Sequence, residues 1–301
     1  MEAFPTSSTR TKRVPAWRVA ALVAVLGNAT FNVYAEWASS TTSREVSDTY
    51  ANLFTPAQYA TSFCALVVAS FLTFCVASLL PSQRDNSVYD RLAVPLVGIN
   101  VAATAWLVAF HAHALALALA LMVALLVLAM DAFSAAHRAI REREIGLYAS
   151  APFSLALGSV CVGLATNVTA LLVSFHVKPF TDAAETAAMV VIGVGALLAS
   201  FVAARFDDFV FPTVIGWATF ALVVAHRFDA PNVGLAGLFA ALICGSATIG
   251  AARELFARRV VLTALDPVPD DAAEPRSLRP TRREGPPPPE FAPLRPRDSW
   301  I

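Results

Sequence analysis

Amide and hydroxyl side chains interrupt several long apolar stretches of the sequence, where they could hydrogen-bond a ligand or a neighbouring helix. Asn28 and Asn32 lie four residues apart, which places them on one face of a helix. Asn100, Thr166 and Asn167 interrupt two later apolar stretches in the same way. Polar groups are costly away from water, so each must serve helix packing or ligand binding. The sequence leaves both interpretations open.

Other residue types that support catalysis or metal binding lack the spacing that such chemistry needs. His111, His113, His176 and His226 end apolar stretches, but no acidic residue is spaced to orient them as metal or haem ligands. The four cysteines share no C-x-x-C spacing. No nucleophile elbow, P-loop, H-E-x-x-H or dinucleotide motif occurs, so we expect a protein that is not an enzyme and requires no cofactor.

The composition indicates that a lipid bilayer surrounds the elements that position these residues. Of 301 residues, 57% are hydrophobic and 15% are charged, whereas soluble proteins have about 25% charged residues. The mean hydropathy is +0.61. Backbone groups inside a bilayer must be satisfied within the spanning segment, and apolar runs of this length favour helices over a barrel. We therefore predict an all-α integral membrane protein, with the bilayer and not nucleic acid as its partner.

Eight apolar segments are long enough to cross a hydrocarbon core of about 30 Å. They cover residues 17–35, 56–80, 92–110, 114–135, 152–173, 184–204, 209–225 and 233–256. The first also resembles a cleavable signal peptide, although Asn28 and Asn32 interrupt its apolar run. Prolines precede the segments or fall near their starts, so we expect unbroken helices, unlike the discontinuous helices of many transporters.

Basic residues predict the orientation, because Lys and Arg concentrate on the cytoplasmic side of membrane proteins. They gather at the N-terminus, in the even-numbered loops and after the last segment, while the odd-numbered loops hold only Arg44, Lys178 and Arg227. Both termini should therefore be cytoplasmic, in the inner or plasma membrane if the protein is bacterial. The loop between the first two helices should face outward, with the polar groups of the first, second, third and fifth helices converging beneath it.

Four segments, taken together, resemble the tryptophan-rich sensory protein family, which is related to the mitochondrial translocator protein (TspO/MBR). Residues 41–59 are similar to the family's first loop and second-helix start, and residues 99–110 to its third helix. Residues 151–158 and 164–167 are similar to its fifth helix. The positions that match the family's ligand-binding pattern are Phe54, Pro56, Tyr59, Asn100, Trp106, Phe153 and Asn167.

The resemblance implies a domain organisation. Residues 1–15 would form a cytoplasmic segment, 16–175 a five-helix TspO-like core, and 176–260 a three-helix membrane extension in which Trp217 resembles a recurring Trp segment. Residues 261–301 would form a cytoplasmic tail. Ten of the 19 prolines lie in this tail, among alternating acidic and basic residues, which favours disorder.

The resemblance also implies a function: binding of a hydrophobic or amphipathic small molecule beneath the first loop, with a sensory or regulatory role. The family's cavity is implicated in binding tetrapyrroles and, in some members, sterols, so porphyrin or haem is one candidate ligand. The chain departs from the family where residues 61–68 lack a Trp and residues 156–159 lack an aromatic, because flat macrocycles stack on aromatic faces. The alternatives are a small-molecule transporter, or a non-catalytic interaction subunit that oligomerises through small-residue faces at 158–163 and 246–250.

Overall fold

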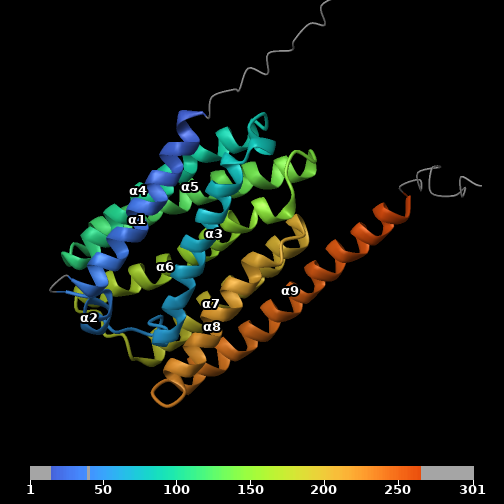
Figure 1. The fold of residues 1–301 in the computed structure, drawn as a ribbon. Helices are drawn as coiled ribbons and strands as arrows, with labels where there is room; N and C mark the ends of the chain where they lie inside the picture. Colours follow the sequence, from blue (N-terminus) through green and yellow to red (C-terminus); the bar gives the residue numbers. More distant parts are fainter. Residues whose placement is uncertain (1–14, 39–40, 266–301) are drawn as a thin grey trace, which may run out of the picture. The chain divides into compact units, whose positions relative to one another are not determined.

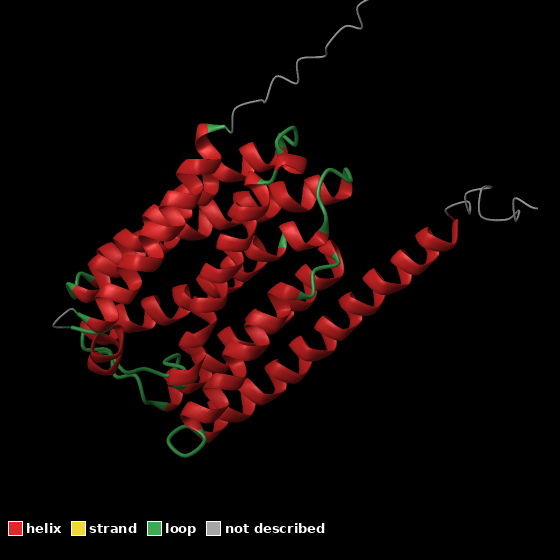
Figure 2. Ribbon diagram, viewed as in Figure 1, coloured by secondary structure: helices red, strands yellow, loops and turns green. Residues whose placement is uncertain are grey.

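The computed structural model describes residues 15–38 and 41–265 of the chain. Most of the predicted N-terminal segment 1–15 and of the predicted tail 261–301 lies outside the described residues. Within these ranges the backbone forms α-helices, short 3₁₀ turns and loops, without strands (Figure 2). The predicted all-α fold class is confirmed.

Each predicted apolar segment corresponds to one long helix, and a short helix occupies the first loop. The bounds are α1 Ala16–Trp37, α2 Ser43–Thr49, α3 Ser62–Leu79, α4 Val88–His111, α5 Leu115–Arg141, α6 Ala151–Ser174, α7 Asp182–Phe206, α8 Val210–His226 and α9 Pro231–Leu265. In the described part of the chain, seven helices are long and apolar enough to cross a membrane. The remaining apolar helix, α8, has 17 residues and is shorter than these.

Local sequence explains where several helices begin and end. Thr42 and Glu45 cap each other's backbone N–H groups at the start of α2, which satisfies donors that a helix start leaves free. His113, Arg143 and His176 adopt left-handed backbone angles just after α4, α5 and α6, a position usually given to glycine. Two of the histidines noted in the sequence therefore have a structural role at helix ends.

The placement of Pro95 differs from the expectation that prolines mark helix starts. Helix α4 begins at Val88, so Pro95 lies inside it. The helix begins four residues before the predicted segment 92–110, because the Asn86 side chain accepts a hydrogen bond from the Val88 backbone N–H and so starts the helix in a polar turn. The helix nevertheless continues to His111 without a break.

The long helices run alongside one another in alternating directions (Figure 1). Contacts join α1 to α3 and α4, α4 to α5, α5 to α6, and α3 to α6; α8 in turn packs against α6 and α7. The aromatic centre of this packing consists of Phe71, Phe74, Tyr89 and Phe153. All of these contacts lie within the unit that ends at Phe256, and a second unit begins at Ala257.

A buried guanidinium joins α1 to the connection between α3 and α4. The Arg18 side chain is 1% exposed, and its Nε donates to Asp90 Oδ1 at 2.7 Å. Its Nη1 donates to the carbonyl oxygens of Ser78 (2.7 Å) and Gln83 (2.8 Å), and its Nη2 to that of Asn86 (2.7 Å). All three guanidinium nitrogens therefore donate hydrogen bonds, and one of these bonds satisfies the Ser78 carbonyl at the end of α3.

Replacing Arg18 by Met should therefore strongly destabilise the fold. The variant removes the donor from the buried Ser78 carbonyl, and a buried acceptor left without its donor costs about 1–3 kcal/mol. It also removes the donors of Gln83 and Asn86 and the counter-ion of Asp90, whose side chain is 37% exposed. The control is Arg91→Met, which breaks a solvent-exposed pair with Glu144 and should cost less than about 1 kcal/mol. Denaturant titration in detergent micelles measures both free energies of unfolding. Equal losses in the two variants would contradict the anchoring role of Arg18.

Candidate functional site

The asparagines at the centre of the predicted pocket bind one another across α1 and α4. Asn28 Nδ2 donates to Asn100 Oδ1 at 3.1 Å, and Asn32 Nδ2 donates to Asn28 Oδ1 at 2.9 Å. Thr104 Oγ1 also donates to Asn28 Oδ1 at 3.1 Å. Asn100 Nδ2 donates to the Leu96 carbonyl at 2.9 Å. These amides hold the two helices together and have partners inside the protein.

A second polar pair joins α4 to α6. Trp106 Nε1 donates to Asn167 Oδ1 at 3.1 Å, and the indole stacks on Phe110. Asn167 Nδ2 donates to the Gly163 carbonyl at 2.8 Å within its own helix. The structure thus brings Trp106 and Asn167 into contact, as a fixed link between helices.

Two of the aromatic residues predicted for the site, Phe153 and Tyr59, have different neighbours. Phe153 is fully buried against Phe71 and Phe74 in the aromatic centre. Tyr59 is partly exposed, and its ring meets Trp217 edge-on at 5.2 Å between centroids. Their ring contacts are therefore with different residues, Phe71 and Phe74 for Phe153 and Trp217 for Tyr59.

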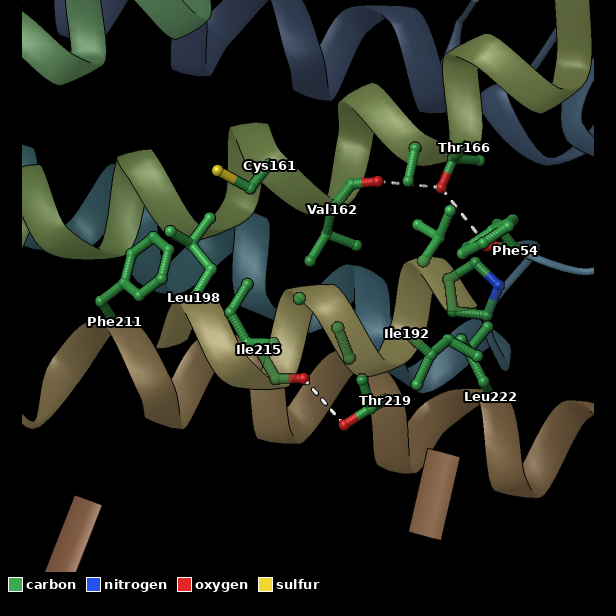
Figure 3. Close-up of a pocket in the computed structure, with 15 residues that line it drawn as sticks. Phe54, Cys161, Val162, Thr166, Ile192, Leu198, Phe211, Ile215, Thr219 and Leu222 are labelled. Atoms are coloured by element: carbon green, nitrogen blue, oxygen red, sulfur yellow. Dashed lines mark hydrogen bonds between the residues drawn. The ribbon is translucent and has the colours of Figure 1, made fainter. Parts of the chain in front are cut away.

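Two of the predicted residues, Phe54 and Pro56, line a cavity of about 110 Å³ between α6, α7 and α8 (Figure 3). The other lining residues are Cys161, Val162, Ala165 and Thr166 on α6, Val191, Ile192, Gly195 and Leu198 on α7, and Phe211, Ile215, Ala218, Thr219 and Leu222 on α8. Two of its three helical walls come from the segment predicted as a C-terminal extension. The first loop thus covers a different interface from the one expected.

Hydrogen bonds to α6 and α8 fix the loop over one end of the cavity. Thr169 Oγ1 donates to Asn52 Oδ1 at 2.8 Å, and the same amide oxygen accepts the Phe54 backbone N–H at 2.9 Å. Thr166 Oγ1 donates to the Phe54 carbonyl at 3.3 Å (Figure 3). Further along the loop, the Ala57 N–H donates to the Ala221 carbonyl of α8 at 3.2 Å. Asn52 is buried, and we did not predict its role from the sequence.

A buried carboxylate fixes the opposite end of the cavity. Asp208 lies in the turn between α7 and α8, and its Oδ1 accepts the backbone N–H groups of Val210 (2.7 Å) and Phe211 (3.0 Å). Its Oδ2 accepts the Ser154 hydroxyl and lies 3.1 Å from His137 Nε2. Because Phe211 lines the cavity, Asp208 ties the cavity wall to α5 and α6.

The surroundings of Asp208 favour its charged form. His137 Nδ1 lies 3.0 Å from the Phe133 carbonyl oxygen, and its Nε2 lies 3.1 Å from Asp208 Oδ2. Burial alone would raise the pKa of Asp208, but bonds from His137, Ser154 and the Phe211 N–H outweigh it and hold the pKa below its usual value. The signal for Asp208 in the sequence was an Asp just before an apolar run, a typical N-cap position.

The cavity offers a ligand almost no free polar group. The Thr166 hydroxyl donates to the carbonyls of Phe54 and Val162, and the Thr219 hydroxyl donates to the Ile215 carbonyl at 3.0 Å. The remaining lining side chains are apolar apart from the Cys161 thiol. In the described part of the chain, no group of three or more His, Cys, Asp or Glu side chains could hold a metal ion. The arrangement therefore suits an apolar occupant.

One of the two small-residue faces proposed for partner helices contacts helices of the same chain. A side chain added at Gly158 would meet Val214 of α8 at 2.8 Å, and one at Gly163 would meet Met122 of α5 at 3.2 Å. Gly250 in α9 has open space around it. The 158–163 face therefore serves internal packing, whereas part of the 246–250 face stays accessible.

Replacing Asp208 by Asn should destabilise the protein by about 1.5–3 kcal/mol, because a neutral amide replaces the carboxylate that accepts the Ser154 hydroxyl and faces His137 Nε2. The depressed pKa of Asp208 adds a pH signature. Its stabilisation is complete above the unfolded-state pKa of about 3.9 and is lost as the pH falls through the lower folded-state value. In denaturant titrations across this acidic range, the wild type should lose stability more steeply than Asp208→Asn.

Asp207→Asn provides the matched control for that experiment. Asp207 adopts a left-handed backbone conformation that Asn tolerates, and it lies outside the Ser154–His137 contacts. It should lose less stability at neutral pH and keep the acid dependence of the wild type. Identical pH profiles for wild type and Asp208→Asn would contradict the stabilising role of the Asp208 carboxylate.

Comparison with known families agrees with the resemblance seen in the sequence. A family model described as TSPO-like protein matches residues 18–250. The match begins in α1 and ends in α9, so it includes all three helices that line the cavity. No curated protein and no solved structure gives a significant match. Because the family model covers well over half of the chain, this multi-pass membrane protein belongs to the TSPO-like protein family.

Proposed function

We propose that this protein binds a hydrophobic small molecule in the cavity between α6, α7 and α8, with a sensory or regulatory role and no catalytic step. One observation carries the proposal: Phe54 and Pro56, from the loop motif that resembles the family's ligand-binding segment, both line the cavity. A ligand at this end would touch the loop directly. The bonds from Thr166 and Thr169 would then transmit its presence between the loop and α6.

The distribution of basic residues predicts on which side of the membrane this loop lies. With both termini in the cytoplasm, Phe54 and Pro56 would lie toward the outer surface. The cavity would then extend from Phe54 and Pro56, on the outer side, to Phe211 beside the cytoplasmic turn between α7 and α8. The excess of Lys and Arg in the even-numbered loops and at the termini supports this orientation.

A tetrapyrrole such as porphyrin or haem fits this cavity poorly. Pockets for drug-sized ligands usually enclose about 300–1,000 Å³, and this one encloses about 110 Å³. Its lining contains no basic residue to pair with propionate groups, and its aromatic side chains are Phe54 and Phe211. We therefore propose a ligand more slender than a macrocycle.

Replacing Gly195 by Leu should block binding. Gly195 lines the cavity, has no left-handed backbone angle, and a side chain added there would meet no atom within 4 Å. Gly193→Leu is the matched control, because Gly193 has the same open space on the same helix but does not line the cavity. Both substitutions raise helix propensity equally, so a difference between them reports on the cavity.

The measurement is thermal unfolding in detergent with a panel of probes: retinol, squalene, cholesterol and protoporphyrin IX. At least one of retinol and squalene should stabilise wild type and Gly193→Leu saturably, by about 2.7 kcal/mol at one hundred times its Kd, and leave Gly195→Leu unchanged, whereas protoporphyrin IX should stabilise none of the three proteins. Stabilisation that is equal in all three proteins, or that no probe produces, would contradict the proposal.

A further inference from the structure

The cavity is long and narrow. Its lining on α8 extends from Phe211 to Leu222, a distance of roughly 16 Å at 1.5 Å per residue. The centre of a water-sized molecule can occupy about 110 Å³ of the cavity, and this space, spread over that length, forms a narrow tube that one thin chain can fill. The length is about half of a hydrocarbon core roughly 30 Å thick, which is the depth that one lipid leaflet occupies.

One wall of the cavity lies at the surface that faces lipid. Val191 and Leu198 line the cavity and are nevertheless 47% and 48% exposed. Their neighbours on α7, Val190, Val194 and Leu197, are more exposed still. Helices α6 and α7 form opposite walls, and each packs closely on α8 while making little contact with the other. A molecule in the bilayer could therefore reach the lining from the side, between α6 and α7.

The third wall, formed by α8, is shielded from bulk lipid. Phe211 and Ile215 line the cavity and are 2% and 7% exposed. A lipid that only surrounds the protein would contact the outer face of α7 and would not reach these two residues. A chain inside the cavity would contact both.

We infer that the natural occupant of the cavity is one acyl chain of a bilayer phospholipid, inserted sideways between α6 and α7. The inference rests on the proposed function and names its ligand class. The chain matches the length and width of the cavity, requires no polar partner from Thr166 or Thr219, and leaves its headgroup at the membrane surface. Phe54 and Pro56 contact one end of the chain, and Phe211 contacts the other.

The test is photocrosslinking of the full chain in nanodiscs of phosphatidylcholine that carries a diazirine in the middle of one acyl chain. Mass spectrometry should find adducts on Phe211 and Ile215 in wild type and Gly193→Leu. These adducts should fall at least fivefold in Gly195→Leu, while adducts on Val190, Val194 and Leu197 stay constant. Adducts confined to those outer residues, or buried adducts that Gly195→Leu leaves unchanged, would overturn the inference.

Two further arms separate the ligand class from the proposed function. A free fatty acid with the same diazirine that labels Phe211 and Ile215 when the phospholipid does not would overturn the phospholipid assignment. A panel probe that stabilises wild type but not Gly195→Leu, without any phospholipid adduct on the buried wall, would also overturn it while the proposed function stands. Absence of both probe stabilisation and buried adducts would remove both proposals.

Discussion

The carboxylate of Asp208 holds the arrangement of the C-terminal helices against the rest of the bundle. It starts α8 through the Val210 and Phe211 N–H groups, and it binds Ser154 of α6 and His137 of α5. These bonds attach the turn between α7 and α8 to both α5 and α6. The width of the cavity depends on that attachment, because α6 forms one wall and Phe211 belongs to the other.

Polar residues elsewhere in the bundle also find their hydrogen-bond partners within the chain. A bilayer supplies no hydrogen-bond partners, so polar groups within it must be satisfied by the chain itself. Arg18 meets this requirement with backbone carbonyls and Asp90, and Asn28 meets it with Asn100. Thr166 satisfies the Phe54 carbonyl of the loop. Polar side chains therefore fasten the helices together, and the cavity they leave is apolar.

The sequence predicts the helices well because hydrophobic length alone determines which segments cross a membrane. It also predicts the family, and through that resemblance it singles out Phe54 and Pro56, which line the cavity. It does not predict the cavity, since residues such as Gly195 and Ile215 are ordinary apolar residues whose position depends on how α7 and α8 pack. His137 and Asp208 are 71 positions apart in the chain, and only the fold brings them together. Asn100 and Asn167 illustrate a third case. Their burial could be predicted from the sequence, but only their hydrogen-bond partners, Asn28 and Trp106, show that they link helices.

The central claim is that the cavity between α6, α7 and α8, beneath Phe54 and Pro56, holds an elongated apolar ligand. An experimental structure of the full chain crystallised from a lipidic mesophase tests this most directly. The account predicts continuous, chain-like density that runs from Pro56 to Phe211 along α8. Side chains of α7 collapsed onto α6, or ligand density confined to the space between α1 and α4 beside Asn28, would contradict it.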